Sequence, residues 1–221
     1  MLRVGVIGCG GMGRDHIRRL TEKIQGAEVV AVSDVFEESA RKAAEICGAK
    51  VYADSKELIN AENVDAVFIV SPGFAHVDSL LQAIEAGKRI FCEKPLCTTA
   101  EDCLKVVKAE EAAGKHLIQL GFMRRYDKGY QQIKEALATG EYGEPLILHC
   151  THRNPEVGTN YNTPMAVHDT AIHEIDVLHW LVDDEYESAQ VVIPRVTKYS
   201  HSELKDPQIM MLRTKKGVCI D

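Results

Sequence analysis

The sequence predicts an α/β protein in which a doubly wound parallel sheet is followed by a second domain of α+β type. Three observations predict this. An apolar strand at the start of the chain runs into closely spaced glycines and then into a helical pattern. Short apolar runs alternate with helical segments up to Gly121, as in right-handed βαβ crossovers. Beyond that residue the alternation stops, and the last strands follow one another without intervening helices. We therefore predict domains at residues 1–121 and 122–221.

A glycine-rich turn comes directly after the first predicted strand, 4–7. Gly8, Gly10 and Gly13 have the spacing G-x-G-x-x-G. The first glycine permits a tight turn, the second lets a pyrophosphate approach the backbone, and the third lets the next helix pack on the strand. Because a helix N-terminus presents free N–H groups and the positive end of its dipole, we expect this turn to bind a diphosphate. For the glycines taken alone, a plain connecting turn is the alternative.

A second strand, 29–34, ends in the acidic residue Asp34. This residue lies about twenty positions beyond the last glycine, where a carboxylate can accept a hydrogen bond from the ribose 2′-hydroxyl of a dinucleotide. Positions 35 and 36 hold no arginine that could bind a 2′-phosphate. The combination of strand, glycine turn, helix and acid predicts a dinucleotide site that prefers NAD over NADP.

The remaining elements of the first domain follow in order. Gly48, Gly87 and Gly114 each lie just past the end of an expected helix, and Thr98-x-x-Glu101 has the capping-box pattern that opens the last one. Helices are predicted at 37–46, 76–86 and 100–113, and strands at 51–52, 65–70, 89–92 and 117–120.

The second domain mixes short helices with strands. The last two expected strands are joined by a short turn, which predicts an antiparallel sheet. Because the chain reaches Asp221 within the last of these strands, we expect the sheet to be incomplete there. The segments predicted are a helix at 130–138, a strand at 146–151, a polar loop at 154–164, a helix from near Asp169, and strands at 190–197, 208–214 and 217–221.

The composition is that of an ordinary globular protein. It is 45 % hydrophobic and 27 % charged with a net charge of −7, and it lacks the basic excess that nucleic-acid binding needs. No long apolar run indicates a membrane span, so we expect a cytoplasmic protein. The seven cysteines are odd in number and include no C-x-x-C pair, which predicts reduced thiols, with neither disulfides nor zinc.

Glu93-Lys94-Pro95 is the first stretch that could carry chemistry. It follows a predicted sheet strand directly, and open α/β sheets bind their ligands at that edge. The proline holds Lys94 in extended geometry and so determines where its ammonium group points. The alternative is an ordinary exposed turn.

The second stretch contains Asp169 and His173, one helical turn apart, so that Asp169 can orient the imidazole. The alternative is a first-turn acid that interacts with the helix dipole and a surface histidine paired with it. Position 177 holds valine where the zinc-protease helix has its second histidine, so we expect no metal site.

The order of these motifs resembles that of a known family. The motifs are the glycine turn, Ser71-Pro72-x-x-x-His76, Cys92-Glu93-Lys94-Pro95 and Asp169-x-x-x-His173-Glu174. The family comprises sugar and cyclitol dehydrogenases related to glucose-fructose oxidoreductase, inositol dehydrogenase and the rhizopine-catabolism proteins, and the likeness covers the whole chain. Within the family, segments 121–127, 152–155 and 173–180 are similar to the bacterial enzymes that oxidise inositol.

The resemblance implies an enzyme with a Rossmann-type first domain that oxidises myo-inositol to its 2-keto product with NAD. It implies that Lys94, Asp169 and His173 form the catalytic group. His173 would accept the hydroxyl proton while Lys94 stabilises negative charge on the oxygen. The cofactor contacts expected are Gly8, Gly10, Gly11, Met12, Gly13, Asp34, Ser71, Pro72, His76, Glu93 and Lys94, and the substrate contacts are Lys94, Met123, Arg124, Asn154, Asp169 and His173.

The resemblance further implies a homo-oligomer, a tetramer, whose second domain continues beyond the position of Asp221. Two alternatives stay open. One is a dinucleotide-binding regulatory or scaffold protein that keeps this fold without turnover, and the other is a dehydrogenase for a related sugar.

Overall fold

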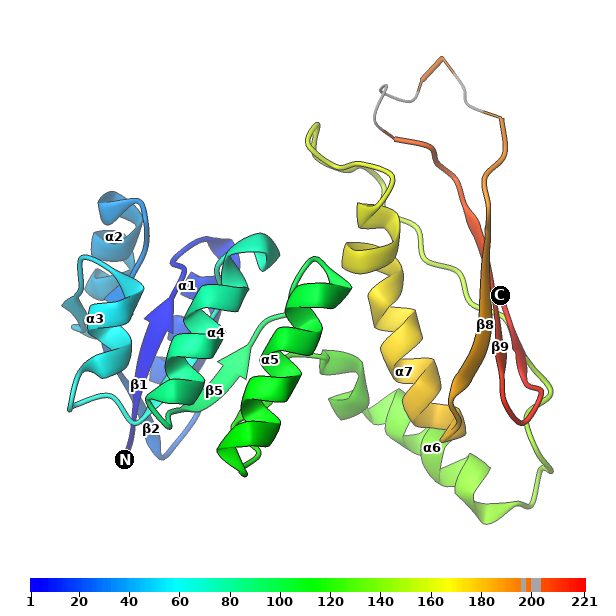
Figure 1. Ribbon diagram of the computed structural model, residues 1–221, viewed down its shortest axis with the longest axis horizontal. Coiled ribbons are helices and arrows are strands. Elements are labelled where there is room, and N and C mark those ends of the chain that lie inside the picture. The colour runs from blue at the N-terminus through cyan, green and yellow to red at the C-terminus, as the bar shows by residue number, and fades with distance from the viewer. Residues whose placement is uncertain (196–197, 200–203) are drawn as a thin grey trace. The chain divides into compact units, whose positions relative to one another are not determined.

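The computed structural model describes residues 1–195, 198–199 and 204–221 of the chain. It divides into two compact units, Met1–Gly121 and Phe122–Asp221 (Figure 1). Each unit has its own core: two apolar clusters lie in the first and one in the second.

The first unit is built on a parallel six-stranded sheet with the order β3-β2-β1-β4-β5-β6. The predicted doubly wound sheet is therefore confirmed. The strand order reverses between β1 and β4, which in such sheets is where a ligand binds beyond the carboxyl ends of the strands. The strands are β1 (Leu2–Ile7), β2 (Ala27–Ser33), β3 (Lys50–Val51), β4 (Ala66–Ile69), β5 (Arg89–Cys92) and β6 (Ile118–Leu120).

Helices cover both faces of this sheet. Those of the first unit are α1 (Gly11–Glu22), α2 (Glu37–Cys47), α3 (Ser55–Asn60), α4 (His76–Glu85) and α5 (Ala100–Ala113), with a 3₁₀ turn, η1 (Gly73–Ala75), before α4 (Figure 1). Side chains of α1 and α2 pack with Val4 and Val6, whereas those of α3, α4 and α5 pack with Val67 and Ile69 on the other face. Because the central strands are buried on both faces, they appear in the sequence as continuous apolar runs.

Two local details of the first unit differ from the predictions. Helix α3 was not predicted; it is short, and the side chain of Asp54 caps it by accepting a hydrogen bond from Glu57 N at 2.7 Å. Helix α5 has the predicted bounds, but its cap is Thr99, whose Oγ1 accepts from Asp102 N at 3.1 Å. Both threonines are followed by an acid three positions later, so the capping-box pattern alone fits either one.

The second unit combines helices with a four-stranded sheet of order β7-β10-β9-β8. The β8–β9 and β9–β10 pairs are antiparallel and the β7–β10 pair is parallel, so the sheet is largely antiparallel. In its core, Val177 and Leu178 pack with Val218 and Ile220. The elements are η2 (Met123–Tyr126, 3₁₀), α6 (Lys128–Thr139), β7 (Ile147–Leu148), η3 (Ala166–Ala171, π-helical), α7 (Ile172–Val182), β8 (Tyr186–Val192), β9 (Ile209–Thr214) and β10 (Cys219–Ile220).

Strand bounds in this unit shift from those predicted. Strand β8 starts at Tyr186, four positions earlier than predicted, because the backbone already pairs with β9 at Thr214. The Tyr186 hydroxyl also donates to Ile175 O in α7 at 2.7 Å. The predicted end of that strand, 196–197, lies outside the described residues. Strand β7 has two residues instead of the predicted six, because its neighbour β10 is equally short.

All seven cysteines, each within the described ranges, are free thiols. Burial raises the pKa of Cys9 and that of Cys97 to about 12, so both remain protonated at neutral pH. Among the helices of the described residues, none has the length and apolar character that crossing a bilayer requires.

Candidate active site

The glycine turn has a backbone that few other residues could form. Gly8 has a φ of +95°, and a Cβ atom there would lie 2.4 Å from Ser71 N. A Cβ atom on Gly13 would lie 2.0 Å from Gly8 O, so α1 approaches the turn at a distance that only glycine allows. At Gly10, in contrast, an added Cβ would meet nothing within 4 Å in the described structure. The first and third glycines therefore serve packing, and the second leaves the backbone open to a ligand.

Asp34 directly follows β2 and stabilises the glycine turn. Its Oδ2 accepts from Cys9 N at 2.6 Å and its Oδ1 accepts from Phe36 N at 2.8 Å. A carboxylate oxygen has two acceptor sites, so each oxygen can still receive a ribose hydroxyl. Asp34 thus has a structural role that the sequence analysis did not predict, in addition to the proposed contact with ribose.

Glu93 and Lys94 follow β5 at the carboxyl edge of the sheet. Glu93 Oε1 lies 2.8 Å from His16 Nε2, and Glu93 Oε2 accepts from Lys94 N at 3.2 Å. Burial, the largest single influence, would raise the pKa of Glu93, but the hydrogen bond and charge of His16 together with the backbone N–H and charge of Lys94 outweigh it, and the pKa lies below its usual range. The ionised Glu93 therefore connects α1 to the backbone of Lys94, which is half-buried.

His16 was not among the predicted site residues. It belongs to α1, and its side chain points toward the sheet. Its ring meets those of Phe68 and Phe91 edge-on, with centroids 5.8 and 5.2 Å away. A polar residue on the inward side of α1, next to Ile17, was the signal that could have identified it.

His76 and Ser71 lie below the surface of the same edge. His76 has 0 % exposure, and its ring nitrogens face the main-chain oxygens of Ser71 and Pro95. The predicted direct contact of His76 with the cofactor would need a side chain that reaches the surface, which this one does not. The hydroxyl of Ser71 is buried, and it has no hydrogen-bond partner among the described residues.

In the second unit, Glu174 joins two groups. Its Oε1 accepts from Arg124 Nη1, and both of its oxygens lie 3.1 Å from His152 Nδ1. The ring of His152 is stacked against that of His173 with centroids 6.5 Å apart, and Phe122 meets His173 edge-on. The structure therefore brings predicted Arg124 and His173 together through His152 and Glu174, neither of which was among the predicted site residues.

The backbone before His173 is not the regular α-helix that was predicted. Asp169 lies in the π-helical segment η3, and α7 begins only at Ile172. A π-helical turn widens the helix, and such turns are frequent at functional sites. Of the other predicted substrate contacts, Met123 is exposed in η2 and Asn154 is exposed in the polar loop.

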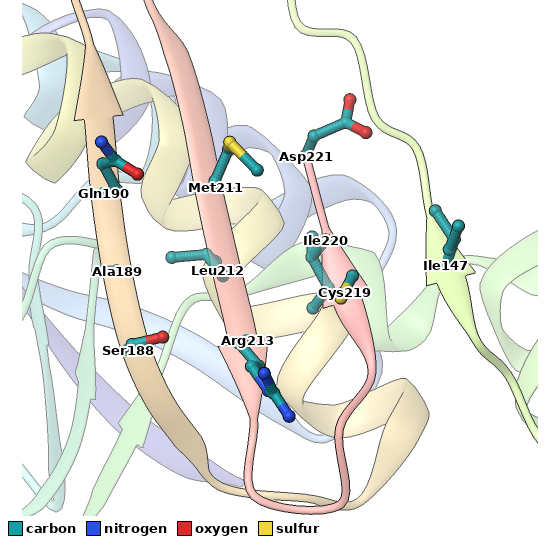
Figure 2. A pocket seen from close by; sticks show the side chains of 10 residues that line it. All are labelled: Ile147, Ser188, Ala189, Gln190, Met211, Leu212, Arg213, Cys219, Ile220 and Asp221. Carbon is teal, nitrogen blue, oxygen red and sulfur yellow. The ribbon is translucent and has the colours of Figure 1, made fainter.

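A shallow groove of about 550 Å³ lies on the sheet of the second unit and involves strands β7, β8, β9 and β10 (Figure 2). Its lining includes Ile147, Gln190, Met211 and Cys219 but none of the predicted site residues. Among the described residues, no three His, Cys, Asp or Glu side chains are grouped so that they could hold a metal ion.

Comparison with protein families places the chain. Residues 2–122 match the model of the oxidoreductase family with an NAD-binding Rossmann fold, and residues 130–221 match the GFO/IDH/MocA C-terminal domain. The chain therefore belongs to the GFO/IDH/MocA oxidoreductase family, as the resemblance predicted.

Individual relatives are more specific. The chain is 56 % identical, over 99 % of its length, to inositol 2-dehydrogenase/D-chiro-inositol 3-dehydrogenase of Shouchella clausii, of which it covers 64 %. It is 54 % identical, over its whole length, to inositol 2-dehydrogenase of Pseudomonas syringae, of which it covers 66 %. Its fold matches myo-inositol dehydrogenase of Lactobacillus casei, solved with NAD(H) and myo-inositol, with a TM-score of 0.95 and 49 % identity, over all of this chain and 66 % of that one. The chain thus spans about two thirds of these relatives.

Proposed function

We propose that the chain forms the cofactor-binding unit and part of the substrate-binding unit of an NAD-dependent inositol 2-dehydrogenase, which oxidises myo-inositol to 2-keto-myo-inositol. The observation that carries the proposal is the 56 % and 54 % identity, over nearly the whole chain, to proteins named inositol 2-dehydrogenase.

The first unit fits a dinucleotide on three counts. The backbone at Gly10 is open, α1 begins beside it, and the buried Ser71 hydroxyl has no partner among the described residues. The diphosphate would lie on the glycine turn, and Asp34 would accept from the adenosine ribose. NAD supplies the hydride acceptor, so the protein needs to contribute only position and electrostatics.

Residues of the chain accept the hydroxyl proton of the substrate and stabilise the negative charge on its oxygen. Hydride loss from a secondary carbinol requires the hydroxyl proton to leave, and neutral His173 accepts it. Asp169 keeps the imidazole in the correct tautomer. The ammonium group of Lys94 stabilises the negative charge that develops on the oxygen.

The polyol needs donors and acceptors on several sides, and we assign them to Arg124 and Asn154, with Met123 as an apolar contact. Nδ1 of His152 faces Glu174, and in a neutral ring that carries its proton on Nδ1 the other ring nitrogen can accept a hydrogen bond from a substrate hydroxyl. We also propose a cytoplasmic homo-oligomer, a tetramer by family resemblance; free thiols suit that compartment.

The proposal is tested by mixing the protein with NAD and myo-inositol and following the absorbance of reduced nicotinamide. We expect turnover with myo-inositol and a lower kcat/KM with glucose. A dinucleotide-binding scaffold would bind NADH without turnover, and a sugar dehydrogenase would prefer glucose, so either result would reject the proposed substrate.

Cofactor preference gives a sharper test. With a carboxylate at position 34, kcat/KM should be at least about tenfold higher with NAD than with NADP, because the 2′-phosphate is repelled at short range. Asp34→Ala should reduce this ratio. Asp54→Ala is the matched control, since Asp54 also accepts a backbone N–H but caps α3 instead. Equal efficiency of wild-type protein with both cofactors would contradict the role of Asp34.

Glu174 should act on substrate affinity. In Glu174→Gln, Arg124 and His152 lose the charge that orients them, and we expect KM for myo-inositol to rise about tenfold while NADH affinity is unchanged. Asp176→Asn is the matched control: Asp176 lies on the same helix and pairs with Arg125 at 2.9 Å. This control should lower the melting temperature without changing KM. If both variants changed KM equally, Glu174 would have only a structural role.

A further inference from the structure

His76 connects two loops at the carboxyl edge of the parallel sheet. It is the first residue of α4 and has 0 % exposure. Its Nε2 lies 2.6 Å from Ser71 O, in the loop after β4, and its Nδ1 lies 2.9 Å from Pro95 O, in the loop after β5. One imidazole thus faces a backbone oxygen in each of the two loops.

The two loops also touch directly. A Cβ atom on Gly73 would lie 2.9 Å from Pro95 Cγ, so the approach depends on glycine at that position. Cys92 Sγ, 3.4 Å from His76 Nδ1, is a thiol whose pKa burial raises well above its usual range, so it adds no charge. The imidazole and the close contact at Gly73 therefore fix the position of one loop relative to the other.

We propose that His76 is a positioning residue that fixes the loop of Ser71 and Pro72 against the loop of Glu93, Lys94 and Pro95. It influences cofactor binding and the position of Lys94 through the backbone of these loops, without contacting the cofactor or the substrate. The identity of the ligand rests on the proposed function; the link between the loops does not.

The chemistry of imidazole explains why a histidine suits this position. Its two nitrogens lie on opposite sides of a rigid ring, so one side chain can contact two backbone segments at a fixed separation. A neutral ring donates to one of the two carbonyls and a doubly protonated ring to both. Loss of the ring would leave buried carbonyl groups without this partner and free the loop that carries Lys94.

The first test compares His76→Ala with Leu80→Ala. Leu80 lies one turn further along α4, also has 0 % exposure, and belongs to the apolar core of the first unit, but its side chain has no polar atom that could bond a backbone oxygen of either loop. We measure the dissociation constant of NADH and, without any ligand, amide hydrogen exchange at 71–73 and 94–97. His76→Ala should weaken NADH binding about tenfold and speed exchange in both loops, whereas Leu80→Ala should change NADH affinity less than about twofold.

The possible outcomes separate three explanations. Equal effects of the two variants would mean that His76 only fills the core, and weaker NADH binding with unchanged exchange would mean that it touches the cofactor; either result overturns the proposal. Hydrogen exchange is measured without ligand, so faster exchange in both loops of His76→Ala supports the link between the loops whether or not NADH binds. If the wild-type protein binds no NADH, the proposed function fails but the link between the loops does not.

Partial replacement gives a second test. The amide nitrogen of Asn can take the place of Nδ1, and that of Gln the place of Nε2. His76→Asn should therefore restore slow exchange mainly at 94–97, and His76→Gln mainly at 71–73. If either variant restored both loops, or if neither differed from His76→Ala, the two-ended link would be refuted.

Discussion

Lys94→Ala should lower kcat by about 10²–10³ and leave the dissociation constant of NADH nearly unchanged, because Lys94 acts on charge that develops during the reaction. Lys94 directly follows Glu93, which is held by His16 and bonds the Lys94 backbone N–H. The loop should therefore keep its place when only the side chain beyond Cβ is removed. The measurement is steady-state kinetics with myo-inositol together with a titration of NADH.

The control for this variant is Lys88→Ala. Lys88 lies just before β5, and its ammonium group donates to Ala61 O at 3.1 Å and to Val64 O at 2.5 Å, so its role is structural. The Lys88→Ala variant should be less stable than the wild-type protein and have the same kcat. If Lys94→Ala instead mainly weakened NADH binding, Lys94 would serve only as a cofactor contact and its assignment as a catalytic residue would be wrong.

His173→Ala should lower kcat/KM by about 10²–10⁴, the range that general acid–base catalysis contributes. In the wild-type protein, kcat/KM for oxidation should fall as the pH drops, because a protonated imidazole cannot accept the hydroxyl proton. The residual kcat/KM of the variant, which lacks the imidazole, should therefore no longer decline at acid pH. The measurement is kcat/KM as a function of pH for both proteins.

His179→Ala serves as the matched control on the same helix. His179 lies further along α7, with its side chain 41 % exposed and 3.5 Å from Glu185. Its removal should leave both the rate and the pH profile unchanged. A His173→Ala variant that kept the acid limb of the wild-type profile would show that another group is the base.

Local features of the chain were predictable from the sequence because they depend on neighbouring residues. The glycine spacing placed the turn, and Gly48 and Gly114 marked helix ends that the structure has in left-handed conformation, φ +73° and +65°. Apolar periodicity predicted the order of the strands and of the helices in the first unit except for the short helix α3. Where two local patterns overlapped, as at Thr98 and Thr99, the sequence could not choose between them, because both threonines carry the same side-chain acceptor.

The sequence by itself therefore determined the parallel sheet, the glycine turn and the presence of Lys94 at the sheet edge. Only the tertiary structure decided that Glu93 pairs with His16, that Glu174 joins Arg124 to His152, and that His76 lies buried between two loops. The physical reason is the distance along the chain. Propensity and periodicity act over a few residues, whereas the partners in these three groups are 77, 50, 22 and 19 positions apart and meet only when the strands and helices that carry them pack.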